Sequence, residues 1–487
     1  MTAASLHRPL PVTAVPRWDD EADVVVIGFG AAGASAAIEA REAGADVLLY
    51  ERNSGSGGAS GLSGGEIYIG GGGGTEVQRA AGFDDPTEDF TAYLKMAGGP
   101  CADDAKCELY GREALSHWEW LKAQGIPYRG NYLPGKHIEP TGDDTLIWSG
   151  SEAAAPFCDA AKPAPRGHVI QFTGWGGGRK LVDILEARVR ALGVRVVVDA
   201  RATALIVEDT RVVGAVMRID NRDHFIRARR GVILATGGFA MNEAMRRKYC
   251  PLTFKINDPI GDKDDGAGIH LGMSAGGDAV HMDQFLTTCP WTIPEPQANG
   301  VFVNIAGQRF INEDCYHGRV SRAMLDQPGD RVYLLLDSAH YSEPFAFART
   351  SIAATGADWE EVERELDMPE GTLAATMAFY NDHARRGADP LFGKRTPILT
   401  PLDQGPFIAL ELNFQSSYFS FFTLGGLSTS TDGEVLDRAG AAIPGLFAAG
   451  RCTHGLPAWG HGYSSGLSLA DCTFFGRRAG GRAADVR

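Results

Sequence analysis

The feature that most constrains the fold is a glycine-rich turn between an apolar strand and a helix. Residues 22–28 read ADVVVIG, an almost unbroken apolar run that is typical of a strand buried on both faces. The turn is G28-F-G30-A-A-G33, and small residues at helical spacing follow it. A second buried strand, DVLLYER at 46–52, contains Glu51 near its end. This order is a βαβ unit and predicts a parallel α/β sheet.

The spacing of this turn predicts a binding site for a dinucleotide. Gly28 permits the tight turn, Gly30 lets a pyrophosphate approach the backbone, and Gly33 lets helix and strand pack closely. The first N–H groups of the helix face the anion. Glu51 lies 18 residues after Gly33, where its carboxylate would accept hydrogen bonds from a ribose.

Three further segments rich in small residues favour FAD over NAD. G57-G-A-S-G-L-S-G-G65 lies just past Glu51, while ATGG at 235–238 and AAG at 448–450 each close a buried strand. One nicotinamide site does not need three such points, whereas a long flavin dinucleotide lying across the sheet does. A flexible linker is the alternative for 54–74, but it would sever the second strand from its sheet. The residues predicted to bind FAD are Gly28, Gly30, Ala32, Gly33, Glu51, Arg52, Gly58, Ala59, Ser60, Gly64, Gly65, Ala202, Gly237, Gly450, Ser468 and Leu469.

The pattern along the chain predicts an α/β protein whose Rossmann-like FAD-binding domain is interrupted by an α+β capping, catalytic domain. Residues 75–130 look helical, 131–180 irregular, and 176–220 like a helix followed by hairpin strands. The predicted parts are an N-terminal arm at 1–20, an FAD-binding domain at 21–280 and 421–487, and a capping domain at 281–420.

Composition narrows the possible partners and the compartment. The formal net charge is −15, and no basic run is long enough to track a phosphate backbone, which disfavours nucleic acid as a partner. No apolar run approaches the length of a membrane span, and the N-terminus lacks the apolar core of a signal peptide. The eight cysteines are scattered, with no metal-ligand spacing, which disfavours a metal site and suits a reducing cytoplasm.

The order of several motifs resembles that of the flavoprotein superfamily of fumarate reductase and succinate dehydrogenase. Besides the turn with Glu51 and the 57–65 loop, the chain carries ATGGF, G261-D-K-D-D-G266, N304-I-A-G-Q-R-F-I-N-E313, TLGGLSTST and IPGLFAAG. The resemblance runs from residue 22 over nearly the whole chain. It implies an FAD domain interrupted by a capping domain, with the reaction at the flavin between them.

The dicarboxylate-binding residues of that superfamily have no counterpart here. Such members carry a His-Pro-Thr motif and an arginine proton donor, where this chain reads H281-M-D-Q-F-L-T-T288 and D314-C-Y316-H-G. The late stretch W459-G-H-G-Y-S-S-G-L-S instead resembles 3-ketosteroid dehydrogenases of the type that oxidises the C4–C5 bond of 5α-reduced substrates. Tyr316, Tyr463 and Ser465 match the catalytic residues of that type.

The resemblance implies a role for each of these three residues. To form a double bond beside a ketone, an enzyme removes a proton from the α carbon and a hydride from the β carbon. By resemblance, Tyr463 holds the C3 oxygen, Ser465 takes the C4 proton, Tyr316 passes it toward solvent, and flavin N5 accepts the C5 hydride. Serine is a weak base at its ordinary pKa, so Ser465 requires a relay.

Several alternatives stay open at the level of sequence. The enzyme could act on C1–C2 or reduce another enoyl compound, or the chain could be a non-catalytic binding protein on an FAD-like scaffold. Tyr463 could pack between domains, and Ser465 could be a helix N-cap. His461 is a further candidate because it lies two residues from Tyr463, and Trp291, Trp459 and the aromatic segment 418–422 are candidates for an apolar substrate cavity.

Two expectations concern the cofactor and the electrons. The usual histidine for covalent attachment of FAD has no counterpart in residues 54–65, so we expect noncovalent FAD. The chain has no cluster or haem motif, so the electrons must leave through an external acceptor.

Overall fold

The glycine turn lies at the end of a central strand of a large mixed sheet. In the computed structural model, which describes residues 8–137, 142–174, 176–261, 263–289 and 295–486, strand order is β1-β9-β10-β11-β2-β3-β8, and β22 also pairs with β11. β2, β3, β8, β11 and β22 run parallel, as the βαβ unit predicts. The bounds are β1 (Leu10–Pro11), β2 (Asp20–Ile27), β3 (Val47–Tyr50), β8 (Arg195–Val197), β9 (Arg201–Glu208), β10 (Arg211–Ile219), β11 (Arg222–Leu234), β21 (Glu434–Leu436) and β22 (Ala442–Ala448).

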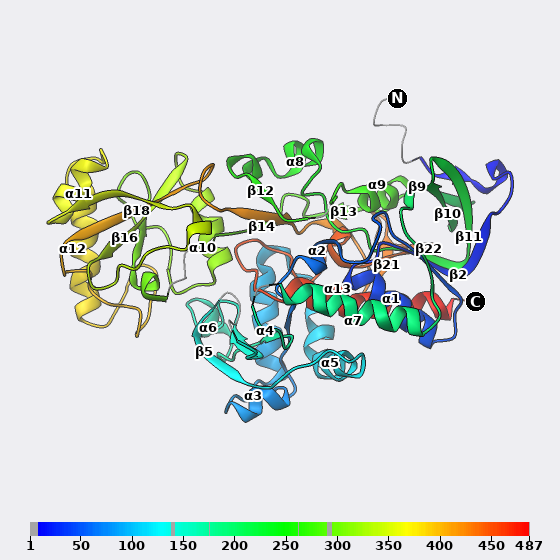
Figure 1. Cartoon of the computed structure of the whole chain (residues 1–487), viewed down its shortest axis with the longest axis horizontal. Helices are drawn as coiled ribbons and strands as arrows, with labels where there is room; N and C mark the ends of the chain where they lie inside the picture. Colours follow the sequence, from blue (N-terminus) through cyan, green and yellow to red (C-terminus); the bar gives the residue numbers. More distant parts are fainter. Residues whose placement is uncertain (1–7, 138–141, 175, 262, 290–294, 487) are drawn as a thin grey trace.

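The segment predicted to be the capping domain, residues 281–420, makes up the left-hand part of an elongated molecule, and we call it the capping region (Figure 1). Its antiparallel sheet has the order β15-β16-β18-β17 and packs against α11 and α12. The chain enters this region through β14 and leaves through β19, which pair with each other. The bounds are β12 (Asp258–Pro259), β13 (Ala279–Val280), β14 (Phe285–Thr288), β15 (Val301–Val303), β16 (Arg331–Asp337), β17 (Ser351–Gly356), β18 (Phe407–Asn413), β19 (Ser420–Thr423) and β20 (Gly426–Leu427).

The helices largely follow the sequence patterns. Thr75 and Gln78 form a reciprocal capping box at the start of α3, and Asp103 caps α5, so both helix starts are fixed by side chains. The bounds are α1 (Ala31–Glu42), α2 (Gly58–Gly61), α3 (Glu76–Ala80), α4 (Thr87–Gly98), α5 (Asp104–Ala123), α6 (Phe157–Ala160), α7 (Gly177–Ala191), α8 (Glu243–Tyr249), α9 (Ala267–Ser274), α10 (His317–Leu325), α11 (Trp359–Glu365), α12 (Thr372–Arg385) and α13 (Leu467–Asp485). Short 3₁₀ turns cover Val12–Ala14, Gly99–Cys101, Pro251–Lys255, Glu295–Asn299, Ala346–Ala348 and Gly450–Cys452.

The prediction that 131–180 is irregular is wrong in part. This segment contributes β5 (Tyr132–Lys136), β6 (Leu146–Trp148) and β7 (Gly167–Val169), which join β4 (Glu66–Tyr68) in a four-stranded sheet. Three of these strands have only three residues, too few for a period-two pattern to be read from the sequence. The Gly/Ser stretch likewise contains α2 and β4 and is no flexible linker.

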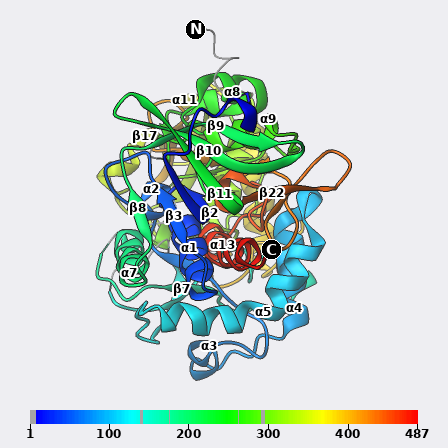
Figure 2. The same cartoon turned by 90° about the vertical axis from the view of Figure 1, so that its right-hand side faces the viewer.

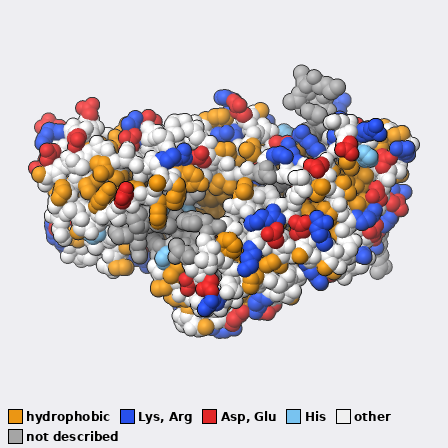
Figure 3. All heavy atoms as spheres, in the orientation of Figure 1, with side chains coloured by type: hydrophobic (Ala, Val, Ile, Leu, Met, Phe, Trp, Pro, Cys, Tyr) orange, Lys and Arg blue, Asp and Glu red, His pale blue; other side chains and the backbone are white. Residues whose placement is uncertain are grey.

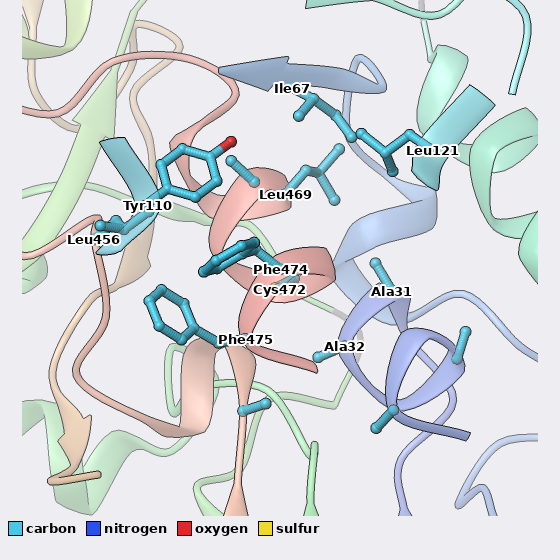
Figure 4. Close-up of a cluster of buried hydrophobic side chains, with 14 of the residues drawn as sticks. Ala31, Ala32, Ile67, Tyr110, Leu121, Leu456, Leu469, Cys472, Phe474 and Phe475 are labelled. Carbon is cyan, nitrogen blue, oxygen red and sulfur yellow. The ribbon is translucent and has the colours of Figure 1, made fainter. Parts of the chain in front are cut away.

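Helices α1 and α13 lie side by side, as Figures 1 and 2 both show, and their contact is unusually close. A Cβ atom added at Gly476 would lie 2.5 Å from the carbonyl oxygen of Ala32, and one at Gly480 would lie 2.2 Å from that of Ala36. Figure 4 shows the buried cluster around this contact, including Ala32 and Cys472. The packing fixes the start of α13 relative to the glycine turn.

Three buried histidines predict a loss of stability in mild acid. Burial lowers the pKa of His168 and His454 to about 4, and that of His117 well below its ordinary value. In the unfolded chain each pKa returns to about 6.5, so the unfolded state binds more protons between about pH 6.5 and about 4. Each histidine therefore lowers the free energy of unfolding by up to about 1.4 kcal/mol per pH unit in that window.

Denaturant titrations across this pH range measure the effect. Asp471 opposes it, because burial raises the pKa of its carboxyl to about 6 and so favours the folded state as the pH falls. Burial also raises the pKa of the Glu152 and Asp264 carboxyls, so the loss of stability should be clearest just below about pH 6.5, where the histidines of the unfolded chain begin to bind protons. A free energy of unfolding that stays constant between about pH 6.5 and about 4 would contradict the prediction.

Candidate active site

A first cavity lies where β2, β3, β11 and β22 end, at the edge of the sheet where ligands bind in open α/β folds. Eleven of the residues predicted to bind FAD line it. They are Gly28, Gly30, Ala32, Glu51, Arg52, Gly58, Ala59, Ser60, Ala202, Gly237 and Gly450. The structure thus brings together residues from five separate segments of the chain.

The other predicted cofactor residues divide into two groups. Gly64, Ser468 and Leu469 line a second, adjoining cavity. Gly33 and Gly65 line neither cavity. A Cβ atom at Gly33 would lie 1.9 Å from the carbonyl oxygen of Gly28, and one at Gly65 would lie 2.6 Å from the backbone of Gly177. These two glycines permit close backbone packing around the site.

The backbone at the turn is arranged to receive a dinucleotide. Gly28 has a φ of +110°, and a Cβ atom there would lie 2.3 Å from the carbonyl oxygen of Ala235. At Gly30, which is the N-cap of α1, an added Cβ would fit the fold at 3.4 Å from Ser60 Oγ but would enter the cavity. The missing side chain at Gly30 therefore leaves room for a ligand at a helix N-terminus.

Glu51 is held in place from both sides. Its Oε2 accepts a hydrogen bond from the backbone N–H of Phe29 at 2.7 Å, and its Oε1 accepts one from Asn53 at 2.7 Å. Each carboxylate oxygen has a further lone pair, and the side chain lines the cavity. The carboxylate can therefore accept hydrogen bonds from a ribose while it braces the turn.

Sequence reasoning missed Arg451 and Asp264, which meet where the two cavities adjoin. The Arg451 guanidinium lies 2.6 Å from Asp264 Oδ2, and the two side chains are only 9% and 4% exposed. The Nη1 atom of Arg451 is buried and has no hydrogen-bond partner among the described residues. A buried donor of this kind suits an anionic or carbonyl-bearing ligand. The sequence signals were the position of Arg451 directly after the AAG turn and the place of Asp264 within the motif G261-D-K-D-D-G266.

The second cavity, of about 620 Å³, lies between the start of α13 and the capping region. Its volume is in the range of small-molecule sites. Apolar and aromatic side chains dominate the wall, and the hydroxyl groups of Tyr316, Tyr463 and Ser465 face the same space. The apolar and aromatic residues are Ala59, Leu62, Ile260, Leu286, Phe347, Tyr418, Phe422, Leu469 and Cys472. The space suits an apolar ligand with a polar end.

The structure brings the three predicted catalytic residues together from two regions of the chain. Tyr316, the N-cap of α10, places its hydroxyl 2.7 Å from Ser465 Oγ. The rings of Tyr316 and Tyr463 lie 6.2 Å apart, and the Tyr463 hydroxyl donates to Ser468 Oγ at 3.0 Å. The hydroxyl pair Ser465–Tyr316 is the start of a path along which a proton can move.

Both tyrosines keep their protons over the ordinary pH range. Burial raises the pKa of Tyr463 to about 12 and that of Tyr316 well above its ordinary value. The Tyr463 side chain is only 5% exposed. A neutral, buried hydroxyl remains a hydrogen-bond donor, which is what stabilisation of an enolate-like oxygen requires.

The alternative role of Ser465 as a helix N-cap does not fit the structure. The N-cap of α13 is Gly466, with no side-chain cap, so Ser465 is not the N-cap. Gly466 has a φ of +92°, and a Cβ there would lie 2.7 Å from the backbone nitrogen of Tyr68. This turn directs Ser465 into the cavity instead.

Two of the other candidates lie away from the cavity. His461 Nε2 is 3.3 Å from Asp326 Oδ2, and Trp459 packs against the backbone of Gly99. Trp291 lies outside the described residues. Within the aromatic segment 418–422, alternate residues face the cavity, namely Tyr418, Ser420 and Phe422. His317 also lines the cavity, 4.2 Å from Tyr316 between ring centres, and the sequence did not single it out as such.

Comparisons with known proteins agree with this geometry. The family model described as FAD binding domain matches residues 23–467. The solved structure of 3-ketosteroid-delta4-(5alpha)-dehydrogenase from Rhodococcus jostii RHA1 in complex with 4-androstene-3,17-dione is 41% identical, with a TM-score of 0.91, over 98% of this chain and 100% of that one. The 3-oxo-5-alpha-steroid 4-dehydrogenase of Comamonas testosteroni is 30% identical, over 89% of this chain and 93% of its own. The 3-oxosteroid 1-dehydrogenase of Mycolicibacterium smegmatis is 27% identical, over 91% and 93%.

Proposed function

Because this chain belongs to the FAD binding domain family, we propose that it is an FAD-dependent oxidoreductase that introduces the C4–C5 double bond into 3-oxo-5α-steroids. The observation that carries this proposal is the meeting of Tyr316, Tyr463 and Ser465 on an apolar cavity that adjoins the dinucleotide site. A steroid ring system is apolar, and its single reacting end carries the ketone that the hydroxyl groups would address.

The first cavity holds FAD in this proposal. Residues of the glycine turn, Glu51 and Arg451 would contact the cofactor, and the missing side chain at Gly30 provides the space for its pyrophosphate. We propose that FAD is bound noncovalently. When bound, it supplies a two-electron acceptor for the hydride that leaves C5.

The protein's own side chains manage the proton and the ketone. When the substrate is bound, Tyr463 turns its hydroxyl proton from Ser468 Oγ to the C3 oxygen, and the Ser468 hydroxyl can donate to the Tyr463 oxygen in return. The hydrogen bond to the C3 oxygen makes the C4 proton acidic. Ser465 Oγ takes that proton while its own hydroxyl proton passes to Tyr316, and the Tyr316 proton passes on toward solvent. The 2.7 Å contact between Ser465 and Tyr316 makes this exchange possible without a charged serine.

The cavity has no built site for two carboxylates. Among the described lining residues the one guanidinium belongs to Arg451, and Asp264 already balances its charge. The composition of the cavity wall agrees with the sequence, which lacks the proton-donor arginine and the His-Pro-Thr motif of the members that bind dicarboxylates. A dicarboxylate would leave at least one of its charges unpaired in a largely apolar space, which is costly.

We propose the following division of the chain. Residues 281–420 form the capping domain, 21–280 and 421–487 the FAD-binding domain, and 1–20 an N-terminal arm. The partners in this proposal are the steroid and an external electron acceptor.

In the described part of the chain, no helix combines the length and apolarity that crossing a bilayer would require. Lys, Arg, Asp and Glu are interspersed on the face in Figure 3.

Replacing Tyr463 by Phe is expected to lower kcat about 10²- to 10³-fold, because one donor to the developing oxyanion is lost. The ring keeps its contacts with Tyr316 and Phe422, so FAD should stay bound. Steady-state kinetics and the flavin absorbance measure the two effects separately. Tyr333→Phe, at a buried tyrosine of the capping sheet, is the matched control. Wild-type kcat in Tyr463→Phe would remove Tyr463 from the reaction.

Product analysis tests the proposed bond. The protein is incubated with an artificial electron acceptor and either 5α-androstane-3,17-dione or 4-androstene-3,17-dione. The proposal predicts that the first compound gains a C4–C5 double bond and that the second is unchanged. Formation of a C1–C2 double bond from either compound would assign the chain to the 1,2-dehydrogenase alternative.

A further inference from the structure

Ser465 and Tyr316 both form hydrogen bonds with one short segment between β6 and α6. We propose that this segment, Ser149-Gly150-Ser151-Glu152, is the positioning element for the proton path, and we call it the strap. It belongs to neither element that carries the pair: Tyr316 begins α10, and Ser465 precedes α13. The inference rests on the proposed function, because it concerns the same proton path.

The strap contacts each catalytic residue through a hydrogen bond to its backbone. The backbone N–H of Ser465 donates to the carbonyl oxygen of Ser149 at 2.9 Å, and Ser149 Oγ donates to the carbonyl oxygen of Ser465 at 3.1 Å. The backbone N–H of Tyr316 donates to Ser151 Oγ at 3.0 Å. Two serine hydroxyls, on either side of Gly150, thus fix the spacing between two residues that lie 149 positions apart in the chain.

The strap is itself held by groups that do not touch the cavity. Glu152 Oε2 accepts the backbone N–H of Gly150 at 2.9 Å, and Glu152 Oε1 accepts the Tyr68 hydroxyl at 2.9 Å. Ser149, Ser151 and Glu152 are at most 2% exposed. Buried and hydrogen-bonded polar groups of this kind lock a single local geometry.

Tyr93 connects the strap to the segment that carries Ser465. Its hydroxyl accepts the backbone N–H of Ser151 at 2.9 Å and lies 2.7 Å from Ser464 Oγ. The fit is close, since a Cβ atom at Gly150 would lie 2.3 Å from Ser464 Oγ and 2.4 Å from the Tyr93 hydroxyl oxygen. Tyr93 does not line either cavity, so it acts on the reaction only through this contact.

Weakening the strap should affect cleavage of the C4–H bond and not of the C5–H bond. A loosened strap lets Ser465 and Tyr316 move relative to the C4 proton. A displacement of about 1 Å can cost on the order of 100-fold in rate. Transfer of the hydride from C5 does not depend on Ser465 and Tyr316. Weakening the strap should therefore slow removal of the C4 proton alone.

Kinetic isotope effects test the inference on the FAD-loaded enzyme. Ser151→Ala removes the acceptor for the Tyr316 N–H, and Tyr93→Phe removes the hydroxyl contact without changing the ring. For both variants we expect kcat to fall about 10- to 100-fold with unchanged KM and flavin absorbance. The isotope effect on kcat for substrate deuterated at C4 should rise above the wild-type value, and that for C5 should not.

Thr145→Ala is the matched control, because Thr145 directly precedes β6 as the strap directly follows it. Thr145 is as deeply buried as Ser151, and its Oγ1 accepts the backbone N–H groups of Arg129 and Gly130 at 2.9 and 3.1 Å. It should lose stability without a change in either isotope effect. If Ser151→Ala does not fold, Tyr93→Phe decides the question, because it preserves the ring packing.

The outcomes separate this inference from the proposed function. Lower kcat in the strap variants with both isotope effects unchanged, or with equal changes in both, would overturn the positioning role. Loss of flavin from Tyr93→Phe would overturn it as well, because the strap would then support the cofactor site. If the wild type itself fails to oxidise 5α-androstane-3,17-dione, the proposed function fails first.

Discussion

Ser465→Ala is expected to lower kcat by about 10²- to 10⁴-fold while FAD remains bound. The substitution removes the oxygen that takes the C4 proton and leaves Tyr316 without its 2.7 Å partner. Ser465 holds the strap through its backbone groups, so the local fold does not depend on the hydroxyl. The variant should therefore fold like the wild type and fail at one chemical step.

Two measurements on Ser465→Ala separate chemistry from folding. Flavin absorbance per polypeptide reports cofactor binding, and single-turnover kinetics report the chemical step. Ser274→Ala, at a serine of α9 whose hydroxyl donates to the carbonyl oxygen of Leu271, is the matched control. A kcat within about twofold of the wild-type value would show that another group takes the proton, since loss of a general base costs about 10²-fold or more.

Gly30→Val is expected to abolish FAD binding, and with it all activity, in a protein that still folds. An added Cβ at this position meets no backbone atom of the fold within 3.4 Å, but it projects into the first cavity at the N-terminus of α1. The pyrophosphate and the valine side chain cannot occupy the same space. This separates Gly30 from Gly33, where any side chain would clash with the backbone of Gly28.

The purified Gly30→Val variant should be colourless and should retain the circular dichroism of the folded chain. Gly55→Val is the control, because Gly55 is exposed in the same loop region, has open space around it, and lines neither cavity. A yellow Gly30→Val protein with normal flavin content would contradict the assignment of the first cavity to FAD.

Much of the fold could be predicted because its signals are local. The βαβ unit shows as two largely apolar segments, 22–28 and 46–52, on either side of a glycine turn and helix, and both strands and the helix lie where this pattern predicts. β22 pairs with β11, which lies more than 200 residues earlier in the chain, while the division into an FAD-binding and a capping domain stays a prediction. The small sheet of β4 to β7 was missed because its strands are too short to show alternation.

The catalytic residues could be predicted only through family resemblance. The local sequence around Tyr316 or Ser465 does not predict that the Tyr316 hydroxyl lies 2.7 Å from Ser465 Oγ, because that contact depends on the packing of the capping region on α13. The relatives confirm the resemblance to 3-ketosteroid dehydrogenases, while the role of each residue remains a prediction. Arg451 and the strap could not be predicted, since their contacts are with segments distant in sequence.

The most direct test of the central claim is a single anaerobic mixing experiment. The purified, FAD-loaded protein is mixed with 5α-androstane-3,17-dione in the absence of any external acceptor, and the visible flavin band is followed together with the steroid products. The proposed function predicts that the flavin bleaches and that an equal amount of 4-androstene-3,17-dione forms. Flavin that stays oxidised, or bleaching that yields a C1–C2 double bond instead, would contradict it.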